Sequence, residues 1–166
     1  VKDSEMIFLE GYLWDEGDPK SAFDKAMSLT QKTTMSLSDK FCVERHKDSF
    51  LELVKNKIDI TFANDQEIQS LIGAKSFEDV INFGKQLKKI LIITRGVKGS
   101  VAIIDNKVIE CDSKKDLNII DLTGAGDLFA AGFLHGYINK FPTEKSLAKG
   151  TEMSSKIIQK IGARLN

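Results

Sequence analysis

The sequence predicts an α/β fold of three layers, in which helices cover both faces of a mostly parallel, Rossmann-like sheet that also carries one β-hairpin. Short β-branched runs alternate along the chain with longer segments whose apolar residues recur at helical spacing. One run, Ile90–Thr94, is continuously apolar, which is typical of a strand buried on both faces of a parallel sheet. Asp105 and Asn106 separate two further strand-like runs and are typical of a tight hairpin turn. We expect a single α/β domain over residues 1–166.

The individual elements follow from the same patterns. Strands are expected at 6–9, 34–37, 58–63, 90–94, 100–104, 107–110 and 119–120. Helices are expected at 21–31, 48–55, 66–72, 77–87, 125–138 and 143–161. Asn64-Asp65 and Ser76 are typical helix caps. Gly132 and Gly136 lie one helical turn apart, and we expect them to allow close packing of their helix against the sheet.

Composition excludes several classes of protein. The 24 basic residues balance 24 acidic ones, which argues against a nucleic-acid partner, and the longest uncharged apolar run, Leu128–Leu134, is too short to span a membrane. Cys42 and Cys111 stand far apart without metal-ligand spacing, so a disulfide scaffold and a structural zinc site are not expected, and a cytoplasmic location is. Cys42 is expected to be a buried inert thiol and His46 a surface residue.

The most informative stretch is the turn from Asp121 to Asp127, in which Gly124 and Gly126 stand one residue apart before an apolar helix. Glycines let a ligand approach the backbone, and a helix start offers unpaired N–H groups and partial positive charge, which together bind phosphate. A carboxylate at Asp127 would repel phosphate, but it has a purpose if it takes a proton from an attacking hydroxyl. The alternative is that Asp127 only complements the helix dipole while the glycines pack.

This turn, together with Leu128-Phe129, resembles the second signature of the ribokinase-like (PfkB) carbohydrate and nucleoside kinases. Further matching segments are Asn64-x-x-Glu67, Thr94-x-Gly96-x-x-Gly99 and, for the adenosine-kinase-like branch, Ser36–Asp39 and Ile161–Arg164. The resemblance covers essentially the whole chain. It implies a ribokinase-like fold and an ATP-dependent phosphotransferase that moves the γ-phosphoryl group to a hydroxymethyl group of a sugar or nucleoside.

The resemblance also implies a role for each matching residue. Asp127 would be the catalytic base, with an anion hole formed by the N–H groups of Gly124, Ala125 and Gly126. The expected ligand contacts are Asn64 and, through water, Glu67 on a Mg²⁺–phosphate complex, Thr94, Gly96 and Gly99 beside the nucleotide, and Asp121 and Thr123 near a monovalent cation such as K⁺. Simpler roles stay open: a helix cap at Asn64, a solvated helix residue at Glu67, a strand exit at Thr94 and a turn initiator at Asp121.

Members of this family are longer, and their N-terminal part carries a first Gly-Gly signature and most sugar contacts. Nothing in the chain resembles that part, so we expect a C-terminal portion that holds the nucleotide and catalytic machinery, with a homodimer left open for the full-length parent. A second hypothesis is a nucleotide-binding module without turnover of its own. A third, a hydride-transfer domain, is weakened by the absence of Gly-x-Gly-x-x-Gly. The acceptor stays open, with a lean towards adenosine-like nucleosides.

Overall fold

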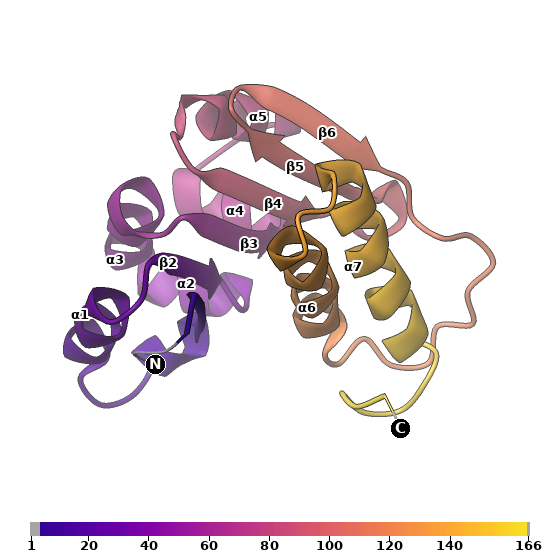
Figure 1. Ribbon diagram of the computed structural model, residues 1–166, viewed down its shortest axis with the longest axis horizontal. Coiled ribbons are helices and arrows are strands. Elements are labelled where there is room, and N and C mark those ends of the chain that lie inside the picture. The colour runs from indigo at the N-terminus through magenta and orange to yellow at the C-terminus, as the bar shows by residue number, and fades with distance from the viewer. Residues whose placement is uncertain (1–3, 166) are drawn as a thin grey trace. The chain divides into compact units, whose positions relative to one another are not determined.

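The computed structural model describes residues 4–165 (Figure 1). Its strands are β1 (Met6–Glu10), β2 (Lys32–Ser36), β3 (Ile60–Asn64), β4 (Ile90–Thr94), β5 (Ser100–Ile104) and β6 (Lys107–Cys111). Its α-helices are α1 (Pro19–Ser28), α2 (Lys40–Arg45), α3 (Lys47–Glu52), α4 (Asp65–Ile72), α5 (Phe77–Gln86), α6 (Ala125–Ile138) and α7 (Thr143–Ile157). Shorter turns are the 3₁₀ helices η1 (Gly11–Trp14) and η3 (Gly96–Lys98) and the π-helix η2 (Leu53–Lys57).

The six strands form one sheet in the order β1-β2-β3-β4-β5-β6. Strands β1 and β2 run parallel with Met6 opposite Lys32, and β2 and β3 run parallel with Thr34 opposite Ile60. Asp105 and Asn106, between β5 and β6, both have positive φ angles of 49° and 63°, the left-handed backbone that a two-residue hairpin turn requires. The predicted mostly parallel sheet with a hairpin is therefore confirmed.

The chain divides into two compact units, which are described separately. The first comprises Val1–Ile92 with Ile103–Asn106, and the second comprises Ile93–Ala102 with Lys107–Asn166. The expectation of a single domain over 1–166 stays a prediction.

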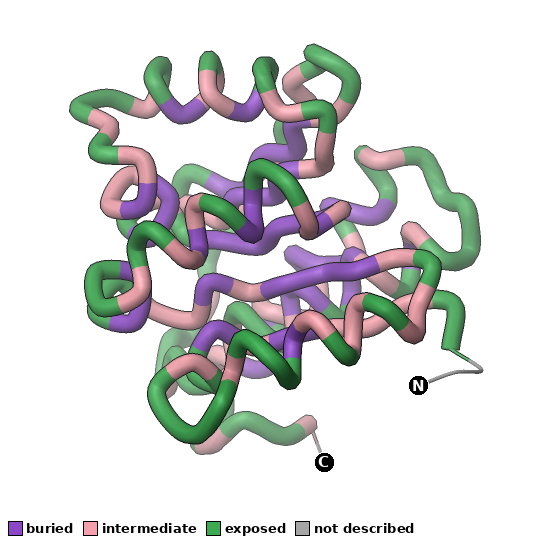
Figure 2. The backbone as a smooth tube through the Cα atoms, turned by 90° about the vertical axis from the view of Figure 1, so that its left-hand side faces the viewer, coloured by how far each residue is buried: buried purple, intermediate pink, exposed green. Residues whose placement is uncertain are grey.

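Strands β2 and β3 supply much of the core of the first unit, and Figure 2 shows buried residues concentrated along strands. In β3 every residue before Asn64 is buried, so that the strand emerges from the core at its carboxyl end. Helix α4 begins there and packs against α2 and α5. The first unit thus holds Asn64 at the boundary between a buried strand and a helix start.

Helices α6 and α7 pack closely against each other in the second unit (Figure 1). A Cβ atom added at Gly132 would lie 2.6 Å from the Lys149 carbonyl oxygen, and one at Gly136 would lie 2.6 Å from Ser146 Oγ. The prediction that these glycines pack against the sheet was therefore wrong about the partner, which is α7. A nearly all-apolar helix offers no polar face to indicate which neighbour each side meets.

Replacing Gly132 with alanine is expected to lower the free energy of unfolding by about 2 kcal/mol, because its Cβ would collide with backbone that can move only if α6 and α7 separate. Chemical denaturation measures the change. Gly126→Ala is the matched control, since a Cβ at that position of α6 meets nothing within 4 Å. Equal stability of Gly132→Ala and the parent would contradict this packing.

Several predicted bounds differ from the structure, and the largest differences concern three elements. The strand expected at 119–120 was wrong: the N–H groups of Ile120 and Asp121 both donate to the Ile158 carbonyl oxygen, at 2.8 and 3.2 Å. The helix expected at 48–55 is divided between α3 and η2, and the last helix ends at Ile157. No helix in the described part of the chain is long and apolar enough to cross a membrane.

Candidate functional site

The glycine turn leads into α6 through a left-handed residue. Gly124 is the N-cap of α6 with φ 76°, and a Cβ added to it would lie 2.8 Å from the Ala163 Cβ. Both observations require glycine, since this backbone conformation strains other residues and Ala163 occupies the space that a side chain at this position would need. The N–H of Ala125 donates to the Leu122 carbonyl oxygen at 3.1 Å, which closes the turn.

The amide groups around this turn are mostly unpaired. Within residues 4–165, the N–H groups of Gly124, Gly126 and Asp127 have no hydrogen-bond acceptor, and no side chain caps α6. The approach to them is open at Gly126, where an added Cβ would meet no atom within 4 Å. Unpaired donors at a helix start, reachable from solvent, fit an anion. An anion hole at Gly124, Ala125 and Gly126 stays a prediction, with the N–H of Ala125 already engaged in the turn.

Asp127 lies in the first turn of α6 and is exposed. Its carboxylate has no hydrogen bond or ion pair to any described residue. The carboxylate is therefore not held in a buried ion pair, and a substrate hydroxyl can reach it from solvent. This geometry permits proton transfer, whereas complementing the helix dipole would require only the charge.

Asp121 stabilises the turn through hydrogen bonds to Thr123 and Gly162. Its Oδ1 accepts hydrogen bonds from the Thr123 N–H at 2.8 Å and the Thr123 hydroxyl at 2.7 Å, and its Oδ2 accepts one from the Gly162 N–H at 2.8 Å. These bonds, led by that of the Thr123 hydroxyl, lower the pKa of Asp121 to about 2. Asp121 is thus the turn initiator and ties the turn to the C-terminal segment. A monovalent-cation site at Asp121 and Thr123 stays a prediction.

The predicted nucleotide-side turn lies in the same unit, at the end of β4. Thr94 ends that strand, and Gly96 is exposed with φ 57° at the start of η3. Gly99 is buried with φ 82°, and a Cβ there would overlap the Cys111 carbonyl oxygen. Conformation and packing therefore account for Gly99, whereas Gly96 is exposed and its carbonyl oxygen accepts a hydrogen bond from the Gly99 N–H at 3.0 Å. The nucleotide role of all three residues stays a prediction.

Asn64 and Glu67 form a capping box at the start of α4, in the first unit. The Asn64 side chain accepts a hydrogen bond from the Glu67 N–H at 2.9 Å, and Glu67 Oε2 accepts one from the Asn64 N–H at 2.8 Å. The cap at Asn64 is therefore confirmed. The alternative of a solvated Glu67 was wrong, because that residue is 5% exposed. Ligand binding by this pair stays a prediction.

The Glu67 carboxyl has an unusually high pKa. Burial raises it from 4.5 to about 7, and the nearby carboxylates of Asp39 and Glu10 add to the rise, while the hydrogen bonds from Asn64 oppose it. Oxygen donors with excess negative charge are what Mg²⁺ prefers, so this group fits that ion. Both Glu67 oxygens already accept from Asn64, which favours contact through a water. Glu67 and Asn64 are the residues that would hold Mg²⁺ here.

Sequence reasoning gave no role to Glu10 and passed over Asp39 as a polar strand end. Glu10 ends β1 and Asp39 lies just beyond β2. The carboxyl ends of parallel strands meet at one edge of a sheet, so the place of both residues at or just after a strand end could have indicated that they lie near Glu67. The Glu10 carboxylate accepts from the Ser38 hydroxyl at 2.9 Å, and that of Asp39 accepts from the Tyr12 hydroxyl at 2.8 Å.

The free energy of unfolding is expected to fall as pH rises from about 4.5 to about 7. Over this range the Glu67 carboxyl ionises readily in the unfolded chain, where it is in water, but its burial in the folded state opposes ionisation. A shift from 4.5 to about 7 corresponds to about 3 kcal/mol of stability, which is fully present below pH 4.5 and lost above pH 7. Denaturant unfolding at several pH values measures this slope. Glu67→Gln should flatten it, whereas Glu78→Gln, an exposed residue in the first turn of α5, should not. An unchanged slope in Glu67→Gln would refute the assignment.

Comparisons with known proteins agree on one family. The family described as pfkB family carbohydrate kinase matches residues 1–166. A cytidine kinase of Thermococcus kodakarensis is 35% identical over 124 residues, 71% of this chain and 43% of that protein. A nucleoside kinase of Methanocaldococcus jannaschii is 32% identical over 120 residues, 72% of this chain and 39% of that protein.

A solved structure shares the fold. The crystal structure of adenosine kinase from Sinorhizobium meliloti superposes with a TM-score of 0.93 at 34% identity, covering 99% of this chain and 52% of that one. The chain thus spans about half the length of that structure and about two fifths of the two curated relatives.

Proposed function

The chain belongs to the pfkB family of carbohydrate kinases, and we propose that it carries the nucleotide-binding and catalytic part of an ATP-dependent kinase. The reaction moves the γ-phosphoryl group of ATP to a hydroxymethyl group of a sugar or nucleoside. The observation that carries this proposal is the start of α6, where the unpaired amides of Gly124 and Gly126 stand beside the exposed, unpartnered carboxylate of Asp127.

Each part of this turn has a proposed task. Asp127 removes the proton of the attacking hydroxyl as its oxygen bonds to the γ-phosphorus and the bond from that phosphorus to the β-phosphate oxygen breaks, which releases ADP. The backbone at Gly124, Ala125 and Gly126 stabilises the negative charge on the transferred group, with the free N–H groups of the two glycines as the first donors. Asp121 keeps the turn in place through its bonds to Thr123 and Gly162.

The remaining site residues hold the nucleotide and its ions. Thr94, Gly96, Gly99 and Thr123 border the nucleotide, and Asp121 with Thr123 lies beside a monovalent cation such as K⁺. Asn64 and, through water, Glu67 hold the Mg²⁺–phosphate complex, and the excess negative charge around Glu67 supports this assignment. Mg²⁺ supplies charge neutralisation on the phosphates. A cytoplasmic location, a small-molecule partner without nucleic acid, and a homodimer of the full-length parent belong to the same proposal.

Calorimetry with Mg-ATP, run beside a phosphotransfer assay, tests the proposal. Adenosine and cytidine are the first acceptors to try, because named relatives of about one-third identity are nucleoside kinases, followed by ribose-like and fructose-like sugars. Binding with transfer supports the kinase. Binding without transfer favours the second candidate, a nucleotide-binding module without turnover, which is motivated by the share of its relatives that the chain spans. Neither binding nor transfer would contradict both.

A further inference from the structure

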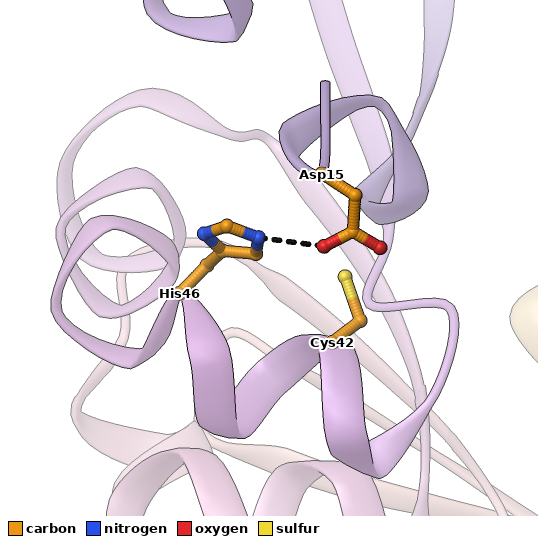
Figure 3. Close-up of side chains that lie close together, drawn as sticks. All are labelled: Asp15, Cys42 and His46. Atoms are coloured by element: carbon orange, nitrogen blue, oxygen red, sulfur yellow. Dashed lines mark hydrogen bonds and ion pairs between the residues drawn. The ribbon is translucent and has the colours of Figure 1, made fainter.

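Three side chains of different chemistry converge in the first unit, and none of them has a role in the proposed kinase site (Figure 3). Cys42 lies in α2 and His46 follows that helix, four residues later, so both face the same side. Asp15 comes from the end of η1, and Figure 3 shows the Cys42 sulfur and the His46 ring both directed towards its carboxylate. The candidate ligand atoms of the three residues all lie within 4.8 Å of one another.

We propose that Asp15, Cys42 and His46 bind a zinc ion, with a water as the fourth ligand. Thiolate, imidazole and carboxylate are the ligands that zinc accepts in proteins, whereas a thiolate disfavours Mg²⁺ and Ca²⁺. In tetrahedral zinc sites the ligand atoms stand roughly 3–4 Å apart, so separations of up to 4.8 Å would shorten and the 2.8 Å pair of Asp15 and His46 would open slightly. The side chains of His46 and Asp15, 23% and 32% exposed, leave the ion a path from solvent.

Groups within and beside the cluster of Asp15, Cys42 and His46 favour an ion there. The Asp15 carboxylate lies at the centre of the three side chains, with its Oδ1 2.8 Å from His46 Nε2. The indole N–H of Trp14 is buried without an acceptor in the described part of the chain, and its ring centroid lies 6.0 Å from that of His46. A metal-bound water would bring an acceptor oxygen to this neighbourhood.

Two features oppose the ion and limit its affinity. Arg45 donates two hydrogen bonds to Asp15, at 3.0 and 2.7 Å, and competes with a cation for that carboxylate. The Cys42 side chain is fully buried, so zinc must displace the proton of a thiol that is out of contact with solvent. Because zinc binds the thiolate, binding releases this proton and strengthens as pH rises. Without metal, the Asp15–His46 hydrogen bond of 2.8 Å ties η1 to α2.

Titration of the metal-free chain with Co²⁺ at mildly alkaline pH, followed by displacement with Zn²⁺, tests the proposal. A Co²⁺–thiolate ligand has a sulfur-to-metal charge-transfer band, so the readout reports the sulfur directly and does not depend on kinase activity. We expect the band in the parent and in Cys111→Ser, the matched control at the cysteine that is not one of the three proposed ligands. We expect Cys42→Ser to abolish it.

Asp15→Asn and His46→Gln should each weaken Zn²⁺ binding by at least about tenfold, since even partners behind the ligands change metal affinity by 10–100-fold. These two variants decide the case if Cys42→Ser fails to fold, as judged by circular dichroism. Absence of the band in the folded parent at saturating Co²⁺ would overturn the proposal. So would a band that depends on Cys111, or one that both Asp15→Asn and His46→Gln leave unchanged.

Discussion

Replacing Asp127 with asparagine is expected to lower kcat by about 10²–10⁴-fold while Mg-ATP affinity stays within a few-fold. Asparagine keeps the shape of the side chain and its place in the first turn of α6, but it cannot take a proton from the attacking hydroxyl. The carboxylate has no partner among the described residues, so the change should break no contact and leave the fold intact. Steady-state kinetics of the active kinase, with calorimetry for the nucleotide, measure both quantities.

Glu144→Gln is the matched control for this change, because Glu144 is an exposed acidic residue in the first turn of the neighbouring helix α7. Removing its charge alters a helix dipole in the same way but should leave kcat unchanged. If Asp127→Asn kept normal turnover and lost only a fraction of a kcal/mol of stability, as Glu144→Gln should, Asp127 would be a dipole partner and not a base.

Replacing Gly126 with alanine is expected to lower kcat by about 10²-fold, the size of effect seen when one donor to a transition-state charge is lost. A methyl group there meets nothing within 4 Å in the structure, so it fills only the space through which the phosphoryl group would reach the amides. Thermal stability should stay the same or rise, since alanine favours a helix over glycine. The pair of measurements is kcat and the melting temperature.

The choice of glycine matters for this experiment. Gly124→Ala would not discriminate, because a residue there has φ 76° and its Cβ would contact Ala163, so lost activity would follow from lost structure. Ala131→Ser, exposed on the same helix, serves as the control that should keep full activity. A Gly126→Ala enzyme with normal kcat would mean that no reacting group approaches the start of α6.

Much of the fold could be predicted because its signals are local. Strand β4 and helix α6 have the predicted bounds, since a continuous apolar run identifies the first and a glycine turn followed by an apolar run identifies the second. The cap at Asn64 was equally readable from residue type and spacing. In each case the segment itself, with the turn or cap beside it, contains the information that the prediction needs.

The predictions that were wrong or incomplete concern features that depend on contacts between distant parts of the chain. Ile119 and Ile120 have strand-like side chains, but the adjacent backbone pairs with the end of α7 and not with a strand. Burial of Glu67, and the two carboxylates that raise its pKa, depend on strands that lie far apart in sequence. His46 was expected at the surface, yet its ring is partly buried and bonded to Asp15, 31 residues away. No local sequence pattern predicts such long-range contacts.

Phosphate binding at the start of α6 is tested most directly by following the backbone amide resonances of Gly124, Gly126 and Asp127 by NMR as nucleotide is added. We expect the amides of Gly126 and Asp127 to shift with Mg-ATP and to shift less with Mg-ADP, which lacks the γ-phosphate. The amide of Gly73, at the end of α4, is a control that should not move. If saturating Mg-ATP, with binding shown by calorimetry, left both resonances unchanged, the start of α6 would not be the phosphate site.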